Sequence, residues 1–428
     1  MKLAVLDPGH FHAALLQKSM YDAIDADVDV YAPGGPELDD YLLKIDGYNA
    51  RPQAPTRWRI HAHVGPDYLE RFARRERGDI AVIAGNNLRK TEYILRSVAA
   101  GYHTLADKPM VIDAAGFAEL GRAFALARAN GVLLYDIMTE RHEITSMLQK
   151  AFAAIEPVFG TLSRGTPDAP AVTKESVHHF AKLVSGAPIV RPAWFFDTAQ
   201  QGEGLVDITT HLVDLVQWAC FPDAILDAVR DVDVLAARRW PTVLSPVQFA
   251  AVTQRAEVPG FLRKDVRADG SLHVHANGEI DYALRGVHAK VTVRWNYEAP
   301  AGAGDTHCSV MRGTKAVLTI RQGEAEAWQP TLYVEPSAAS DPATLDRALM
   351  AAMPGVQAQY PGVDVAPRGG AWRVVVPARY HVGHEAHFAQ VTEQFLRYVA
   401  QRALPEWEVP GMLAKYATTT RALALARG

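Results

Sequence analysis

The sequence predicts an α/β protein in which a doubly wound parallel sheet is followed by a mostly antiparallel sheet flanked by helices. Three observations carry this prediction. Up to about residue 155, short apolar runs alternate with helical spacing, which is typical of a parallel sheet. Beyond that point, strand-like runs follow one another without helical spacers. With 428 residues the chain exceeds one ordinary core, so we expect two domains, at 1–155 and 156–428.

The first expected strand is the apolar run 3–6, which ends in Asp7-Pro8-Gly9 and gives way to helical spacing. Further strand-like runs complete the predicted parallel sheet, at residues 28–31, 58–60, 80–83, 102–105 and 132–135. The segment between Pro33 and Arg57 is rich in Pro, Gly and Asp, so we expect an irregular excursion there.

The second part of the chain is expected to contain one long helix that carries Asp207 and His211. Strand-like runs then predict the antiparallel sheet, at 271–275, 289–295 and 316–320. Amphipathic helices at 384–399 and 410–425 close the chain, and we expect at least one to pack against the first domain.

The composition favours a globular protein with a small-molecule partner. Apolar residues make up 49% of the chain and the formal net charge is only −4, which gives no field suited to nucleic acid or an anionic membrane. No apolar run approaches the length of about eighteen residues that suggests a membrane span. Cys220 and Cys308 are too few for a disulfide framework. We therefore expect a cytoplasmic protein.

One helix face and one strand end predict a site. Asp207 and His211 stand four residues apart, which places a carboxylate and an imidazole on the same side of a helix. Asp107-Lys108-Pro109 follows an apolar strand and would bring a lysine to the carboxyl edge of the parallel sheet. Acid, base and cation can then meet over one substrate, whereas Asp214 falls on a neighbouring helix face.

These motifs, in this order, resemble those of the Gfo/Idh/MocA oxidoreductases over nearly the whole chain. Asp107-Lys108-Pro109 is similar to the family's Glu-Lys-Pro, and the segment from Asp207 to His211 is similar to its Asp-x-Gly-x-His helix. The resemblance implies a Rossmann-type first domain that binds NAD or NADP. It also implies hydride transfer between nicotinamide and a secondary alcohol of a sugar or polyol, and a dimer or tetramer formed through the second sheet.

The first turn departs from the family pattern. A dinucleotide fingerprint would read G-x-G-x-x-G, but only Gly9 survives, at the place of the second glycine. His10 or His12 is expected either to bond a phosphate oxygen or to face solvent from the turn. The predicted cofactor contacts are Gly9, His10, Phe11, His12, Asn86, Asn87, Asp107 and Lys108.

The second strand leaves the choice of cofactor nearly open. It ends in Tyr31-Ala32-Pro33-Gly34-Gly35 and offers neither an acid for the ribose hydroxyls nor an arginine for a 2′-phosphate. Because no cation lies between Val30 and Tyr41, the sequence slightly favours NAD over NADP.

The predicted chemistry assigns one role to each member of the motif pair. His211 is the expected base, since an unperturbed imidazole titrates near pH ~6.5. Lys108 would stabilise the developing alkoxide, and Asp207 would orient substrate hydroxyls or hold the lysine. Thr209, in place of the family's glycine, predicts a narrower or more polar pocket.

Aromatic and polar residues further along predict the walls of a sugar pocket. The expected substrate contacts are His178, Trp194, Phe196, Gln201 and Thr210, although ordinary domain packing is an equal alternative for the tryptophan and phenylalanine. His384 and His387 lie three apart rather than the four of a zinc-binding helix, so no metal is expected.

Two other functions stay open at this point. A lyase or glycosidase could retain NAD and oxidise a sugar transiently. A sensor could keep the dinucleotide fold without turnover, which the incomplete glycine fingerprint would suit.

Overall fold

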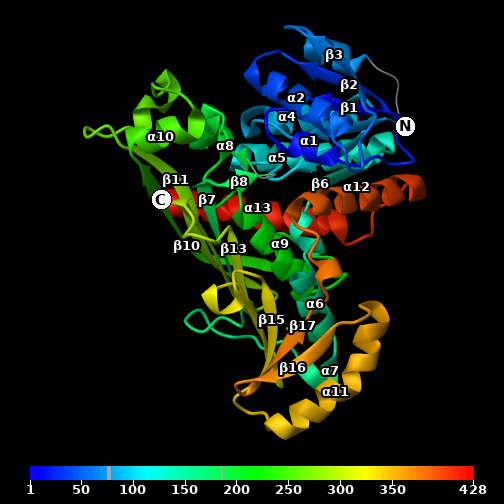
Figure 1. Cartoon of the computed structure of the whole chain (residues 1–428), viewed down its shortest axis with the longest axis vertical. Coiled ribbons are helices and arrows are strands. Elements are labelled where there is room, and N and C mark those ends of the chain that lie inside the picture. The colour runs from blue at the N-terminus through cyan, green and yellow to red at the C-terminus, as the bar shows by residue number, and fades with distance from the viewer. Residues whose placement is uncertain (75–78, 185–186) are drawn as a thin grey trace.

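The predicted fold class is confirmed by the computed structural model, which describes residues 1–74, 79–184 and 187–428. A six-stranded parallel sheet and a nine-stranded, mostly antiparallel sheet lie at opposite ends of the molecule (Figure 1). The division into domains at about residue 155 stays a prediction.

The six-stranded sheet has the order β3-β2-β1-β4-β5-β6, with every pair parallel. β1, β4 and β6 are buried along their whole length, as expected for strands covered on both faces. The strands are β1 (Leu3–Leu6), β2 (Asp27–Ala32), β3 (Arg59–Val64), β4 (Ile80–Ile83), β5 (His103–Asp107) and β6 (Leu134–Ile137). Their connecting helices are α1 (His12–Leu16), α2 (Pro36–Ala50), α3 (Tyr68–Ala73), α4 (Lys90–Ala99) and α5 (Ala114–Asn130).

The prediction of an irregular segment between Pro33 and Arg57 is wrong, because most of this segment forms α2. Pro36 starts this helix, where its missing N–H costs nothing, and Glu37 lies in the first turn. The side chains of Leu38, Tyr41 and Ile45 recur at helical spacing and are buried. This apolar stripe outweighs the turn-forming composition of the segment.

The nine-stranded sheet has the order β10-β11-β12-β7-β13-β14-β15-β17-β16. Only the β12–β7 pair is parallel among its pairings in the described residues. The strands are β7 (Val172–Ala181), β10 (Val232–Leu244), β11 (Leu272–Leu284), β12 (Val287–Glu298), β13 (Thr306–Arg312), β14 (Ala316–Arg321), β15 (Thr331–Pro336), β16 (Asp364–Arg368) and β17 (Ala371–Val375). A short pair, β8 (Leu183–Val184) with β9 (Ala187–Pro188), stands apart.

The helix expected to carry both Asp207 and His211 begins later than predicted. α9 spans Thr209–Cys220, and Asp207 lies in the turn that precedes it. The main-chain N–H of Thr210 still donates to the carbonyl oxygen of Asp207 at 3.3 Å, so the two predicted site residues remain one helical turn apart. The other helices of this part are α6 (Ile144–Ala153), α7 (Glu156–Phe159), α8 (Thr198–Gln201), α10 (Pro246–Thr253) and α11 (Pro342–Gln359).

The last two helices, α12 (His384–Gln401) and α13 (Glu408–Arg427), lie between the two sheets (Figure 1). Phe388 and Phe395 of α12 join the hydrophobic cluster built around the parallel sheet. α13 contributes Tyr416 to that cluster and Leu423 to the cluster of the second sheet. The end of the chain therefore joins the two cores.

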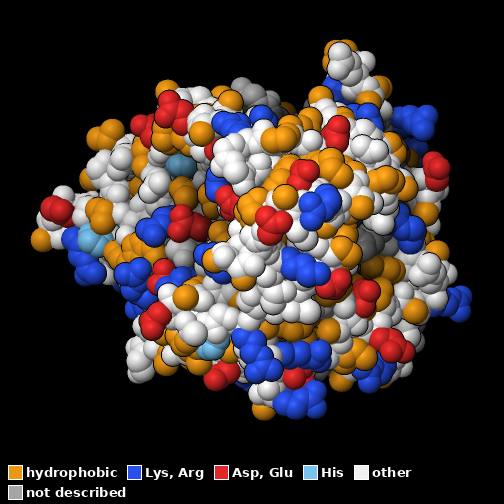
Figure 2. All heavy atoms as spheres, turned by 90° about the horizontal axis from the view of Figure 1, so that it is seen from below, with side chains coloured by type: hydrophobic (Ala, Val, Ile, Leu, Met, Phe, Trp, Pro, Cys, Tyr) orange, Lys and Arg blue, Asp and Glu red, His pale blue; other side chains and the backbone are white. Residues whose placement is uncertain are grey.

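Positive and negative side chains are interspersed over the face of the molecule shown in Figure 2, in keeping with the small net charge. Within the described ranges, no helix is long and apolar enough to cross a membrane.

Candidate active site

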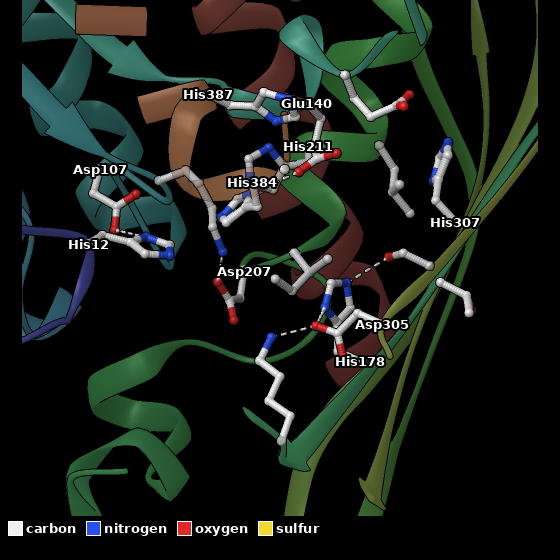
Figure 3. A pocket seen from close by; sticks show the side chains of 18 of the residues that line it. His12, Asp107, Glu140, His178, Asp207, His211, Asp305, His307, His384 and His387 are labelled. Atoms are coloured by element: carbon white, nitrogen blue, oxygen red, sulfur yellow. Dashed lines mark hydrogen bonds and ion pairs between the residues drawn. The ribbon is translucent and has the colours of Figure 1, made fainter. Parts of the chain in front are cut away.

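A cavity of about 480 Å³ opens at the carboxyl edge of the parallel sheet and reaches the second sheet. The turns after β1, β4 and β5 line one side of the cavity. Residues of β7, of β12 and of the start of β13 line the other side. The start of α9 and the start of α12 complete the wall. Figure 3 shows side chains around the cavity that come from both sides, among them Asp107, His178, His211 and His384.

Lys108 and Asp207 meet in this cavity. The Lys108 Nζ donates to Asp207 Oδ1 at 2.6 Å, and the two side chains are only 7% and 6% exposed. Asp207 Oδ2 accepts from Gln201 Nε2 at 3.1 Å. Lys108 follows β5 and Asp207 precedes α9, so this buried ion pair joins the two halves of the chain. The sequence predicts that Asp207 either orients substrate hydroxyls or holds Lys108 in place, and this geometry matches the second role.

His211 lines the same cavity and is buried. Its Nδ1 has no hydrogen-bond partner among the described residues. Burial, together with the nearby charge of Lys108, lowers the pKa of His211 to about 3. The expectation of an unperturbed imidazole is therefore wrong, because desolvation opposes the charged form. His211 is neutral at pH 7.

A carboxylate that the sequence did not single out lies beside the imidazole of His384. Glu140 Oε1 is 3.4 Å from His384 Nδ1, and Figure 3 places His211 and His387 next to this pair. Burial alone would raise the pKa of Glu140, but its interaction with His384 lowers it. Glu140 is therefore ionised at neutral pH.

The turn after β1 brings two more imidazoles against Asp107. His12 Nδ1 is 2.9 Å from Asp107 Oδ2, and His10 Nδ1 is 3.7 Å from the same oxygen. Burial is the main cause that lowers the pKa of both histidines well below the ordinary value. Of the two expectations for these histidines, exposure to solvent is wrong, since their side chains are 15% and 10% exposed and line the cavity.

The turn after β4 is tied to α8. Asn86 Nδ2 donates to Gln200 Oε1 at 2.7 Å, and Asn87 Nδ2 donates to the Gln201 carbonyl oxygen at 2.7 Å. Asn87 and Gln201 line the cavity, as Phe11 does. These bonds place Asn86 and Asn87, which are predicted cofactor contacts, next to Gln201, which is a predicted substrate contact.

His178 lies on the far wall, where Asp305 binds three cationic or imidazole groups. Asp305 accepts from His178 at 3.1 Å, His179 at 3.0 Å and Lys182 at 2.5 Å. Burial alone would raise the pKa of Asp305, but these partners lower it well below the ordinary range. The ring of Trp295 lies 5.2 Å from that of His178. The far wall thus combines an aromatic surface with fixed polar groups.

Three predicted substrate contacts do not line the cavity. Phe196 is fully buried against Phe180 and Phe249. Thr210 is also fully buried, and its hydroxyl donates to the carbonyl oxygen of Val206 at 2.9 Å. Trp194 is turned toward the β1 turn. For Trp194 and Phe196, packing is therefore the better supported of the two alternatives.

Several cavity residues were missed by sequence reasoning. Glu140 follows β6, so its place at the carboxyl edge of the parallel sheet could have indicated it. Trp295 lies on β12, Lys182 follows β7 and Asp305 precedes β13, and the sequence does not reveal the order of these strands. The cavity also contains His307, whose buried Nε2 has no partner in the described part of the chain.

Comparisons with known proteins agree with this architecture. A family model described as "Putative oxidoreductase C terminal domain" matches residues 148–427. A crystal structure described as "a putative oxidoreductase" from Parabacteroides merdae is 51% identical, with a TM-score of 0.97, over 100% of this chain and 97% of that one. This chain belongs to that oxidoreductase family. The resemblance to the Gfo/Idh/MocA oxidoreductases is confirmed.

More distant solved structures share the fold. A levoglucosan dehydrogenase in complex with NADH and levoglucosan is 13% identical, with a TM-score of 0.62, over 100% of this chain and 97% of that one. A 3-ketoreductase from Actinomadura kijaniata in complex with NADP and TDP-benzene is 16% identical, with a TM-score of 0.56, over 99% and 96%. No curated protein matches the chain.

The residues at the carboxyl edge of the parallel sheet fit the nicotinamide end of a dinucleotide. Asn87 Oδ1 is buried at the cavity and has no partner within the described residues, so it can accept from a carboxamide. The β1 turn is more crowded than a glycine-rich one. The His12 N–H already donates to His10 Nδ1 at 3.4 Å, and the side chains of His10, Phe11 and His12 all line the cavity. Contacts to the phosphates must therefore differ from those of the usual fingerprint.

Proposed function

We propose that this protein is an NAD(P)-dependent oxidoreductase that acts on a secondary alcohol of a sugar, polyol or sugar derivative. The observation that carries the proposal is the meeting of Lys108, Asp207 and His211 in one cavity at the carboxyl edge of a Rossmann-type sheet. All three side chains are buried and line the same cavity, which supports a shared role toward one bound substrate.

Asn87, Lys108 and the β1 turn would hold the cofactor, whose nicotinamide ring accepts or returns a hydride when bound. NAD is favoured over NADP, because Glu37 opens α2 and no lysine or arginine lies between Val30 and Tyr41. A carboxylate near the second strand suits ribose hydroxyls and repels a 2′-phosphate.

Lys108 and His211 have different roles toward the substrate oxygen. The Lys108 ammonium stabilises negative charge on that oxygen, and Asp207 keeps the ammonium in place. His211 is neutral and therefore has a lone pair that can accept the hydroxyl proton. Because Lys108 is one cause of the lowered pKa, an alkoxide beside the lysine would offset its charge and make protonation of His211 easier.

The far wall supports a sugar-like substrate. The Trp295 ring offers an apolar surface for the C–H face of a pyranose. His178 on this wall and Gln201 of α8 line the cavity with hydrogen-bonding groups for hydroxyls, and Asp305 fixes the imidazole. The number of such groups favours a substrate with several hydroxyls over a simple alcohol.

The test is a panel of sugars and polyols incubated with the purified protein and either NAD⁺ or NADP⁺. Substrate-dependent formation of free NADH is the expected result. Native mass spectrometry of the same protein would show whether a dinucleotide is retained. A product formed without net NADH would instead indicate the lyase or glycosidase chemistry, and absence of dinucleotide binding by calorimetry would overturn the proposal.

A further inference from the structure

We propose that His10, His12 and Asp107 form a binding site for a divalent transition-metal ion such as Zn²⁺. Each residue can offer one ligand atom, and these atoms all lie within 4.8 Å of one another. The site goes beyond the proposed hydride transfer, which requires no metal. It also replaces the expectation, drawn from the spacing of His384 and His387, that the protein holds no metal.

The distances are close to those of a coordination shell. In a zinc site the metal–ligand bonds are about 2.0–2.2 Å, so neighbouring ligand atoms stand roughly 3–3.6 Å apart. Asp107 Oδ2 is 2.9 Å from His12 Nδ1 and 3.7 Å from His10 Nδ1. The two imidazoles are nearly perpendicular, with ring centres 4.1 Å apart. His10 Nδ1 now accepts from the His12 N–H at 3.4 Å, a long bond that a metal ion would replace. Small side-chain rotations would then bring all three groups to one ion.

The main chain holds the three residues in place before any ion binds. Asp107 is the last residue of β5, and the buried Lys90 amine donates to its carbonyl oxygen at 3.1 Å. The His10 N–H donates to the carbonyl oxygen of Ala84 at 3.2 Å, which ties the β1 turn to the end of β4. A site on fixed backbone costs less ordering on binding than one on a free loop.

The ligand types select the class of ion. Imidazole nitrogens suit zinc, iron, nickel and copper, whereas calcium and magnesium prefer oxygen ligands alone. Two imidazoles with one carboxylate occur in catalytic sites that leave a position open for water or substrate. All three side chains line the cavity, so the open position would face the substrate space.

The neighbouring charges can be balanced. Lys108 follows Asp107, but its ammonium is bonded to Asp207 at 2.6 Å. Lys90 is fully buried, and its amine donates to the main-chain carbonyl oxygen of Asp107 at 3.1 Å. Asp107 therefore supplies the negative charge nearest to the ion, and Asp207 offsets one lysine. A second positive charge in the cavity would also favour an anionic substrate oxygen or a phosphate.

The experiment is calorimetric titration of ZnCl₂ into protein freed of metal by a chelator, with zinc counted by mass spectrometry. We expect one Zn²⁺ per chain. His12→Ala and Asp107→Asn should each weaken zinc binding by at least ~10²-fold. Loss of a residue that only hydrogen-bonds a metal ligand costs up to about 100-fold, and loss of a ligand itself should cost at least as much. His178→Ala, which removes an imidazole from the far wall, should bind zinc as the wild type does.

Circular dichroism must show that each variant is folded, and His10→Asn provides a second, milder change. Wild-type affinity in all three ligand variants would place the ion elsewhere and overturn the proposal, as would the absence of binding by wild type. NADH binding is measured on the zinc-free protein in parallel. NADH binding without zinc binding would remove only the metal site, whereas zinc binding without dinucleotide binding would remove only the proposed function.

Discussion

Lys108 and Asp207 form a buried ion pair whose members come from the two halves of the chain. Taking either charge out of water is costly, and their attraction compensates only while both are present. The ammonium therefore has a fixed position, as is required of a group that stabilises charge on a reacting oxygen. Burial, and after it the charge of Lys108, lowers the pKa of His211.

Lys108→Ala and His211→Ala are each expected to reduce turnover by at least ~10²-fold, the usual scale for loss of a positioned charge or proton-transfer group. Cofactor affinity should change little in His211→Ala, because this histidine is not among the predicted cofactor contacts. Steady-state kinetics and cofactor titration measure the two effects separately. Lys44→Ala, at an exposed pair on α2, is the control and should leave turnover unchanged. Wild-type turnover in His211→Ala would remove this histidine as the base.

Gly9 has room for a side chain in the free protein. A Cβ there would lie 3.5 Å from Asn86 N and 3.7 Å from Trp194 Cζ2, which are ordinary contacts. Gly9→Ala should therefore melt like the wild type yet bind the dinucleotide about tenfold more weakly, a loss of roughly 1.4 kcal/mol. Gly9→Val should weaken binding further. Equal affinities in all three proteins would contradict the predicted contact, and Gly121→Ala on α5, with open space around it, is the matched control.

The sequence predicted part of the site because some residues belong to local motifs. Lys108 follows an apolar strand, and His211 stands one helical turn beyond Asp207, so short-range patterns sufficed. Asp305 and Trp295 were not predictable in this way. Their places depend on which strands neighbour β7 in a sheet of nine, and strand order is not encoded in local spacing.

At the scale of elements, α9 and α13 are joined by a buried network of charges. Asp214 of α9 accepts from Arg141 at 2.6 Å and from Lys415 of α13 at 2.8 Å. Lys415 also lies 2.7 Å from Asp136 at the end of the parallel sheet. Sequence spacing had suggested that Asp214 was on a different face from the site, but not that it was buried against α13.

Asp214→Asn is expected to lower the free energy of unfolding by about 3–5 kcal/mol, since it leaves buried cations uncompensated. Burial alone would raise the pKa of Asp214, but Arg141 and Lys415 hold it well below the ordinary value. Its contribution is therefore complete above about pH 4 and is lost as the pH falls further. Urea unfolding at several pH values tests this.

The difference between wild type and Asp214→Asn should shrink below about pH 4. Asp233→Asn, an exposed change on β10, should remain within about 0.5 kcal/mol of the wild type. A constant difference from pH 7 down to pH 3 would show that the carboxylate's charge is not what stabilises the network.

α2 and α9 show how element prediction failed and succeeded. The composition of the segment after Pro33 suggested turns, but the buried stripe of Leu38, Tyr41 and Ile45 makes it a helix. α9 was recognised from its spacing, although its start lies two residues after Asp207. In both cases the decisive contacts are with other elements, whereas composition and propensity describe only the segment itself.

For the whole molecule, α13 does more than complete a core. Its side chains reach both hydrophobic clusters, Lys415 bridges Asp136 and Asp214, and Arg427 bonds Glu203 at 2.8 Å. The cavity lies between the two sheets that this helix connects. The relative position of Lys108 and His211 therefore depends on a helix that begins about two hundred residues beyond His211 and about three hundred beyond Lys108.

We predict that the protein is a dimer or tetramer formed through the outer face of the nine-stranded sheet. On β12, Val291 and Val293 face the core, whereas Lys290 and Arg294 belong to the opposite face, where Lys290 pairs with Asp281 at 3.2 Å. Arg294 and Arg238 both lie over the ring of Trp240, at 5.7 and 4.9 Å. This combination of an aromatic ring with paired charges suits a partly polar subunit interface.

Trp240→Glu would replace the aromatic ring of this patch with a carboxylate. On assembly that carboxylate would lose its water, and only the charges of neighbouring arginines would offset this cost. Light scattering across micromolar concentrations should therefore show an oligomer for the wild type and a smaller species for Trp240→Glu. Leu43→Glu, an exposed change on α2 in the first domain, is the control and should leave the mass unchanged. A wild-type mass near the 46.8 kDa of one chain at all concentrations would contradict the prediction. The charged outer face of the sheet would then be hydrated and would have no partner subunit.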